Sequence, residues 1–320
     1  MTLDDIRAAA RDLVGVARRT TLREMPALSQ RAGVPVYLKL ENEQPTGAFK
    51  LRGAWTLISR LAPAARERGV ITYSSGNHGQ AVAFVAHRLG IRAVVTMPET
   101  APTAKVDGVR RWGGEVVLAG TTSEDRYGRA LALAESDGLA VVPPFDHPDI
   151  IAGQGTVGLE IAEDLPSVAH VAVPVGGGGL IAGITTALAY LCPGAAVTGV
   201  EPTGGAALAA ALEAGAPVRL ERTGSVADGL LPLSVGTLTF AHLDGRVDAV
   251  QVTDEAIIEA TRWLHRSGGV PAEPSGAATT AAIRSGVWQP HGPTVLVVSG
   301  GNVDPDTIDT LSPALASVSR

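Results

Sequence analysis

The stretch Pro45-Thr46-Gly47-Ala48-Phe49-Lys50-Leu51-Arg52-Gly53-Ala54 places a lysine between small and apolar neighbours, directly after a Pro-Thr-Gly turn. A lysine removed from water has a lowered pKa, so its amine can be uncharged and nucleophilic. Such an amine can form a Schiff base with a carbonyl group. The alternative is an ordinary lysine that extends from a buried helix start to solvent. Lys50 alone favours that alternative, and three further segments reverse the preference.

The first of these segments is Gly176-Gly177-Gly178-Gly179, between an expected strand at Val171–Val175 and an expected helix at Leu180–Leu191. Glycines here let backbone N–H groups converge, and the helix N-terminus adds a positive dipole. The arrangement predicts an anion site, most often for phosphate. A tight turn without a ligand is the alternative, but four consecutive glycines exceed what such a turn needs.

The same glycines also fit the relaxed dinucleotide fingerprint Gly177-x-Gly179-x-x-Ala182. Glu201 then ends the next expected strand about 20 residues later, where a ribose-binding acid would lie. This alternative predicts a nicotinamide-dependent oxidoreductase. It gives no role to Lys50 or to the second segment, and a non-catalytic anion-binding module is a third option.

The second segment is Ser74-Ser75-Gly76-Asn77-His78-Gly79-Gln80, between an expected strand at Val70–Ser74 and an expected helix at Asn77–Leu89. Two hydroxyls, an amide and several backbone N–H groups meet there at a helix N-terminus, which suits a carboxylate or another small anion. Helix capping by Ser75 or Asn77 explains only one of these polar residues. His78 is a candidate general base. A metal role for it lacks a second His or Cys at ligand spacing.

The third segment, Ser299-Gly300-Gly301-Asn302, ends an expected strand at Thr294–Val298. A hydroxyl at the carboxyl end of a parallel strand points into the ligand crevice of α/β folds. A polar turn that leaves the sheet is the alternative.

Short Val- and Ile-rich runs alternate with longer helical patterns, which predicts a parallel α/β architecture. The other expected strands are Val36–Leu40, Ala93–Met97, Glu115–Leu118, Val197–Val200 and Ala249–Val252. Further examples of expected helices are Glu124–Ser136 and Asp254–Ser267. No obvious linker divides the chain, so a second domain is expected to be inserted within the first.

Composition narrows the function classes. The 320 residues suggest about two domains, and 45% of them are hydrophobic, which is ample for a large core. The net charge of -6 and the lack of a basic run argue against a nucleic-acid partner.

Cys192 is the only cysteine, which fits a reducing compartment and predicts a cytoplasmic protein. The uncharged stretch Val171–Val200 is long enough to span a membrane, but its glycines and Pro193-Gly194 favour a buried strand, loop and helix.

Taken together, the four segments resemble the fold-type II pyridoxal-phosphate enzymes, whose fold is that of the tryptophan synthase β chain. The threonine/serine dehydratases (threonine ammonia-lyases) and serine racemase are the most similar members. The resemblance runs from about Thr20 to Asn302, with the motifs in family order. It implies two α/β domains with mostly parallel sheets covered by helices. Residues 1–59 and 148–320 would form the large cofactor-binding domain, and residues 60–147 the smaller inserted domain.

The resemblance also assigns cofactor contacts by position. Lys50 would hold pyridoxal 5'-phosphate as an imine and act as the base at the substrate Cα, with Phe49 packed beside the ring. Asn77 would hydrogen-bond the 3-hydroxyl of the ring. The run Gly176–Gly179 would bind the phosphate, and Ser299 would face the pyridine nitrogen.

Substrate contacts follow in the same way. Ser74, Ser75, Asn77 and His78 would surround the substrate carboxylate. Ser75 is also the candidate second acid/base on the face opposite Lys50, which would permit racemisation. Arg126 matches an arginine that serine racemase-like enzymes turn toward the active site. Its guanidinium could hold a second carboxylate of the substrate. The alternative is that Arg126 is a surface residue paired with Glu124.

Glu201 matches a carboxylate that binds a cation in serine racemase-like proteins. The second carboxylate of that site would fall at Ala207, which cannot supply one. Hard cations prefer several oxygen ligands, so a divalent cation is expected to be weakly bound or absent.

The implied reaction is the dehydration and deamination of L-threonine or L-serine to a 2-oxo acid and ammonia. A serine hydroxyl at Ser299 would not keep the pyridine nitrogen protonated, which favours prompt loss of the β-hydroxyl. Alternatives within the family are a serine-type racemase and a 3-hydroxyaspartate dehydratase. The chain ends about 20 residues after Ser299, so no effector-binding domain is expected there. The resemblance implies a catabolic homodimer.

Overall fold

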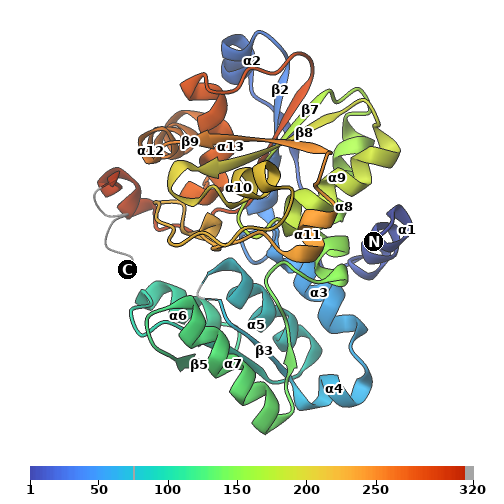
Figure 1. The fold of residues 1–320 in the computed structure, drawn as a ribbon, viewed down its shortest axis with the longest axis vertical. Helices are drawn as coiled ribbons and strands as arrows, with labels where there is room; N and C mark the ends of the chain where they lie inside the picture. Colours follow the sequence, from blue (N-terminus) through green and yellow to red (C-terminus); the bar gives the residue numbers. More distant parts are fainter. Residues whose placement is uncertain (75, 314–320) are drawn as a thin grey trace.

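The computed structural model describes residues 1–74 and 76–313, which form two sheets with helices around them (Figure 1). The larger sheet has the strand order β1-β2-β10-β7-β8-β9, and the smaller has the order β5-β4-β3-β6. Neighbouring strands are parallel except β1 and β2, which are antiparallel. The predicted parallel α/β architecture is therefore confirmed.

The strands are β1 (Leu22–Glu24), β2 (Val36–Leu40), β3 (Val70–Thr72), β4 (Ala93–Met97), β5 (Glu115–Leu118), β6 (Ala140–Val141), β7 (His170–Pro174), β8 (Ala196–Pro202), β9 (Val247–Val252) and β10 (Thr294–Val298). The α-helices are α1 (Leu3–Asp12), α2 (Pro26–Ala32), α3 (Lys50–Arg60), α4 (Pro63–Arg68), α5 (Asn77–Leu89), α6 (Thr103–Arg110), α7 (Ser123–Asp137), α8 (Pro148–Asp164), α9 (Gly179–Leu191), α10 (Ala207–Ala214), α11 (Thr237–Ala241), α12 (Asp254–Trp263) and α13 (Pro274–Ser285). Short helical turns are η1 (Glu41–Glu43), η2 (Thr203–Gly205), η3 (Asp228–Leu230), η4 (Leu264–Gly268) and η5 (Pro305–Thr310).

Most expected elements are present, and the differences have local causes. β1 and β6 were not expected, because β1 has only three residues, two of them charged, and β6 has only two. The single helix expected at Asp254–Ser267 is α12 followed by the π-helical turn η4. Gly269 ends that turn in the left-handed conformation, with φ 60°.

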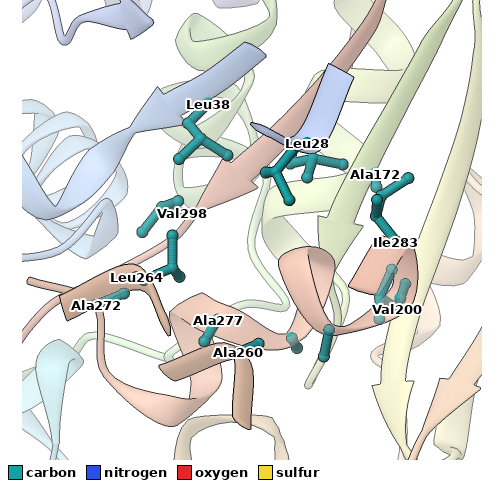
Figure 2. Packing of buried hydrophobic residues seen from close by; sticks show 14 of the residues in the cluster. Leu28, Leu38, Ala172, Val200, Ala260, Leu264, Ala272, Ala277, Ile283 and Val298 are labelled. Carbon is teal, nitrogen blue, oxygen red and sulfur yellow. The ribbon is translucent and has the colours of Figure 1, made fainter. Parts of the chain in front are cut away.

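The larger sheet lies between two apolar cores, which explains why its strands lack polar alternation. Along β10, Leu296 and Val298 belong to one core, and Val295 and Val297 belong to the other. The first core packs the sheet against α2, α12 and α13 (Figure 2). The second packs it against α8, α9 and α10. Both faces are therefore covered by apolar side chains, and the free strand ends are the natural place for a polar site.

The start of α3 is held by a buried charge network that the sequence reading did not identify. The Arg52 guanidinium makes two hydrogen bonds to the Glu41 carboxylate, at 2.8 and 2.7 Å, and one to Glu160 at 2.6 Å. Lys39 pairs with Glu160 at 2.6 Å. All four side chains are buried, and they tie α3 to β2, η1 and α8. Partnered in this way, buried charges impose one arrangement on the elements that carry them.

The smaller sheet is built from residues between Val70 and Val141, which lie inside the expected domain 60–147. In Figure 1 this sheet and helices α4 to α7 form the lower part of the molecule. The domain boundaries themselves stay a prediction. None of the helices within residues 1–74 and 76–313 is long and apolar enough to cross a membrane.

Candidate active site

The turn before Lys50 lies against the end of β10. Gly47 has φ 73°, and a Cβ at this position would lie 2.2 Å from the Asn302 side-chain oxygen, so only glycine fits. The Phe49 N–H donates to the Ser299 carbonyl at 3.0 Å. Ala48 and Gly300 form an isolated antiparallel bridge. Two of the quoted segments, far apart in the sequence, are thus joined through their backbones.

Lys50 occupies the first position of α3, with its amine away from bulk water. Its Nζ donates to the Pro144 carbonyl at 2.7 Å and lies 5.1 Å from the centroid of the Phe49 ring. Burial lowers the pKa of Lys50 to about 8. A substantial fraction of the amine is therefore uncharged at mildly alkaline pH.

The chain has three lysines, and Lys50 differs from the other two. Lys39 is paired with Glu160, and Lys105 is paired with Asp228. Within residues 1–74 and 76–313, Lys50 has no carboxylate partner. It is the lysine whose environment suits nucleophilic chemistry.

The glycine run is packed so closely that side chains would collide with its neighbours. A Cβ at Gly177 would lie 2.2 Å from the Phe145 ring, and one at Gly178 would lie 2.9 Å from Thr239 Oγ1. Gly178 has φ 91° and caps the N-terminus of α9. Thr239 Oγ1 also donates to the Gly177 carbonyl at 2.9 Å. The loop is thus rigid, with bare backbone at a helix N-terminus, which fits a phosphate group.

The glycine run and Lys50 lie on two sides of one short segment. Pro144 accepts the hydrogen bond from Lys50, and the next residue, Phe145, packs against Gly177 and Gly179. Asp146 then accepts hydrogen bonds from the Leu238 and Thr239 N–H groups, at 2.9 and 3.0 Å. The sequence reading assigned no role to Phe145 or Asp146, because nothing in Pro143-Pro144-Phe145-Asp146 indicates which loop it contacts.

Asn77 begins α5, but its side chain does not cap the helix, whose N-cap residue is Gly76. Asn77 Nδ2 donates to Glu273 Oε1 at 2.6 Å, and Asn77 Oδ1 accepts from Asn302 Nδ2 at 2.7 Å. Ser74 Oγ accepts weakly from the Gly76 N–H at 3.4 Å. Ser75 lies outside the described residues. The capping alternative is thus wrong for Asn77.

His78 is buried, and its imidazole is neutral. Its Nε2 lies 3.0 Å from the Val142 carbonyl, which can only accept, so Nε2 carries the proton. Burial, with a smaller effect of the Lys50 charge, lowers the pKa of His78 to about 3. This value argues against a general base at neutral pH. Contact with a substrate carboxylate stays a prediction.

Ser299 is buried at the end of β10, beside the turn that leads to Lys50. This is the position expected for a residue that faces a cofactor held by Lys50. The contact with the pyridine nitrogen stays a prediction.

Arg126 lies near the start of α7 and is half-buried. Its Nη2 donates to Ser123 Oγ at 2.9 Å, and its Nε is buried without a partner among the described residues. Glu124, the partner considered in the surface alternative, pairs with Arg219 instead. The next residue, Tyr127, packs edge-on against Tyr73 with ring centroids 4.9 Å apart.

Glu201 lies one residue before the end of β8 and accepts hydrogen bonds from the N-terminus of α10. Its two carboxylate oxygens accept from the Leu208 N–H at 2.7 Å and the Ala209 N–H at 2.9 Å. Burial raises the pKa of Glu201 to about 7. Each oxygen thus has a backbone partner from α10, and the binding of a cation by Glu201 stays a prediction. In residues 1–74 and 76–313 no group of three or more His, Cys, Asp or Glu side chains could hold a metal.

The sequence reading also missed Glu273. It is 7% exposed, and burial together with the negative charge of Asp228 raises its pKa to about 8. A usable signal was present, because Glu273-Pro274-Ser275-Gly276 is a polar run with proline at the first position of α13. It resembles the run before α5.

A family model described as "Pyridoxal-phosphate dependent enzyme" matches residues 14–300. The chain belongs to this family. The chain is 41% identical to the L-threonine ammonia-lyase of Thermotoga maritima over 312 residues, 97% of this chain and 78% of that protein. It is 40% identical to a biosynthetic L-threonine dehydratase of Pasteurella multocida over 93% of this chain, but spans only 59% of that protein.

Solved structures agree with the family. Maize serine racemase superimposes with a TM-score of 0.92 at 34% identity, covering 97% of this chain and 96% of that one. The T.th. threonine deaminase gives a TM-score of 0.90 at 41% identity, covering 95% and 99%. The predicted fold type and cofactor are thus confirmed, and the nicotinamide alternative is wrong. The rigid glycine loop and the Lys50 amine fit the phosphate and the aldehyde of pyridoxal phosphate.

Proposed function

We propose that this pyridoxal-phosphate enzyme dehydrates and deaminates L-threonine or L-serine to a 2-oxo acid and ammonia. The observation that carries the proposal is the environment of the Lys50 amine. Its pKa is lowered, and it has no carboxylate partner among the described residues. The glycine loop lies on the other side of the Pro144-Phe145 segment that Lys50 contacts. The names of the relatives at about 40% identity support an ammonia-lyase.

In this proposal Lys50 has two tasks. It anchors the cofactor and, once the substrate amine has displaced it, takes the proton from the substrate Cα. The cofactor, when bound, supplies the electron sink that acidifies this proton. A pKa of about 8 suits Lys50 as a base, because it lies close to the working pH and leaves far more free amine than an ordinary lysine has.

The other side chains position groups and exclude water. The N–H groups of Gly176–Gly179 bind the phosphate, and Phe49 packs beside the ring. Ser299 faces the pyridine nitrogen with a neutral hydroxyl, which favours loss of the β-hydroxyl over a persistent negative charge at Cα. Ser74, Ser75, Asn77 and His78 surround the substrate carboxylate. The single proton of the neutral His78 ring is directed to the Val142 carbonyl, so this ring is not a donor to the carboxylate.

Two alternative activities within the family, racemisation and 3-hydroxyaspartate dehydration, each have one supporting observation. The similarity to maize serine racemase favours racemisation, which needs a second base such as Ser75. The half-buried Arg126, whose Nε has no partner among the described residues, favours recognition of a second carboxylate, as in 3-hydroxyaspartate. Arg126→Ala should then lower the specificity constant for 3-hydroxyaspartate far more than that for threonine.

A substrate panel tests the proposal. The purified holoenzyme is given L-threonine, L-serine, D-serine and 3-hydroxyaspartate, and the formation of 2-oxo acid is measured. We expect the highest specificity constant for L-threonine or L-serine. A holoenzyme that forms no 2-oxo acid from either would contradict the proposal. Exchange of the D-serine Cα proton in deuterated water reports separately on racemisation.

We further propose a cytoplasmic homodimer. The single cysteine, Cys192, is a free thiol, which suits a reducing compartment. The names of the relatives include biosynthetic dehydratases, so they do not favour the catabolic role. Light scattering of the holoenzyme would measure the assembly.

A further inference from the structure

Three polar side chains from separate elements meet beside the Lys50 turn. Asn77 begins α5, Glu273 precedes α13, and Asn302 follows β10. Asn77 Nδ2 donates to Glu273 Oε1 at 2.6 Å, and Asn302 Nδ2 donates to Asn77 Oδ1 at 2.7 Å. The proposed function uses only Asn77, so Glu273 and Asn302 are so far without a task.

The direction of this chain of hydrogen bonds follows from one backbone group. Asn302 Nδ2 also donates to the Thr46 carbonyl at 2.8 Å, and a carbonyl can only accept. The amide nitrogen of Asn302 must therefore face both Thr46 and Asn77. Asn77 can meet that nitrogen only with its oxygen, which leaves its own nitrogen toward Glu273. The assignment of oxygen and nitrogen in both amides is thus determined by Thr46.

Gly300 lets these side chains approach the Lys50 turn. A Cβ at Gly300 would lie 2.5 Å from Glu273 Oε1 and 3.0 Å from Asn77 Nδ2. Gly300 is also bridged to Ala48, two residues before Lys50. The Glu273–Asn77 pair therefore belongs to the active site and not to a separate surface cluster.

We propose that Glu273 and Asn302 are positioning residues that hold the Asn77 amide in one orientation, so that it donates to the ring oxygen of bound pyridoxal phosphate and cannot accept from it. This inference rests on the proposed role of Asn77. A donor favours the ionised form of a ring hydroxyl, whereas a rotated amide would present its oxygen and favour the protonated form. The orientation should therefore affect both cofactor affinity and the cofactor's absorbance.

The protonation state of Glu273 does not change this direction. Asp228 and Lys105 are the charged groups that act on Glu273, with opposite effects on its pKa. Oε1 can accept from Asn77 whether the carboxyl group is neutral or ionised. Glu273→Gln keeps an acceptor oxygen at similar volume, so it is the matched control for Glu273→Leu, which removes the acceptor.

The test measures the dissociation constant of pyridoxal phosphate and the pH dependence of its visible absorbance when bound. Glu273→Leu should weaken binding roughly three- to tenfold, the effect of one positioned hydrogen bond, and shift the pH at which the absorbance changes. Glu273→Gln should stay within about twofold of wild type. In an Asn77→Ala background, Glu273→Leu should add less than about twofold, because its effect acts through Asn77.

Three outcomes would overturn the inference. One is a Glu273→Leu variant with wild-type affinity and absorbance. Another is an equal loss in the wild-type and Asn77→Ala backgrounds, which would make Glu273 merely structural. The third is Asn77→Ala with unchanged affinity and absorbance, which would also remove the proposed role of Asn77, while 2-oxo acid formation still tests the reaction. If Glu273→Leu does not fold, Asn302→Ala is measured in the same two backgrounds, since the exposed Asn302 side chain tolerates replacement.

Discussion

Lys50 combines an apolar environment with a hydrogen bond to the Pro144 carbonyl, and the other two lysines are both ion-paired. Lys50→Ala should therefore lose the visible absorbance of the bound cofactor and lower turnover by more than about a thousandfold. Borohydride reduction of the holoenzyme followed by peptide mass spectrometry should find the cofactor on Lys50. Lys105→Ala is the control and should keep both the label and the absorbance. Label on Lys39 or Lys105 would contradict the assignment.

Ser299 is buried, so a charge introduced there acts through little water. Ser299→Asp should protonate the pyridine nitrogen, stabilise negative charge at the substrate Cα and slow elimination by at least about tenfold. A long-wavelength absorbance band should appear with substrate. Ser299→Ala is the matched control, because it removes the hydroxyl without adding charge. Equal elimination rates for Ser299→Asp and Ser299→Ala would argue against contact with the nitrogen.

At the scale of elements, the glycine loop before α9 has no room for side chains. Gly177→Ala places a methyl group 2.2 Å from the Phe145 ring, so the loop or the ring must move. We expect pyridoxal phosphate to bind at least about tenfold more weakly, because the phosphate depends on several loop N–H groups. Gly194→Ala is the control, since a Cβ there meets nothing within 4 Å. Equilibrium titration with the cofactor measures both, and equal affinities would contradict the phosphate role.

Helix α10 is capped by Glu201, whose two oxygens accept from the Leu208 and Ala209 N–H groups. A hard cation prefers several oxygen ligands, and Ala207 cannot supply a second carboxylate beside Glu201. We therefore expect less than about a twofold change in turnover after treatment with a chelator. Metal analysis before and after treatment is the measurement. Tight stoichiometric magnesium or calcium, lost together with activity, would overturn this prediction.

How well the sequence predicted the structure depends on the range of the interaction. β4, β5, β10 and α5 have the expected bounds, because their apolar periods and end signals are local. The segments around Lys50 and Ser299 could be expected to meet, since carboxyl ends of parallel strands share one edge. The Asn77–Glu273 contact joins residues 196 positions apart. The Arg52 network buries charged side chains, which a sequence pattern assigns to the protein surface. The polar run at Glu273 marks a helix start, but no local pattern pairs Glu273 with Asn77 or Arg52 with its carboxylates.

At the scale of the whole molecule, two buried carboxyl groups should contribute less stability as pH rises through neutrality. Burial raises the pKa of Glu201 to about 7 and that of Glu273 to about 8, whereas both groups ionise near 4.5 when unfolded. Between these values the folded chain binds more protons than the unfolded chain, so the contribution to stability is complete below about pH 4.5 and is lost as pH approaches 8. For Glu201 alone the difference is at most about 3 kcal/mol.

Lys50 does not oppose this trend between pH 5 and pH 7. Its pKa is lowered to about 8, so over that interval it is protonated in both states and affects stability only at higher pH. His78 does oppose the trend, because its folded pKa of about 3 lies below its ordinary 6.5, so its contribution to stability rises with pH up to about 6.5. The effect of each carboxyl group is therefore measured as a difference from wild type. Urea unfolding of wild type, Glu201→Gln and Glu273→Gln at pH 5 and pH 7, at one cofactor concentration, measures the effect. Relative to wild type, each variant should be more stable at pH 7 than at pH 5, because glutamine does not ionise. Equal changes in stability in all three proteins would show that these carboxyl groups keep ordinary pKa values in the folded chain.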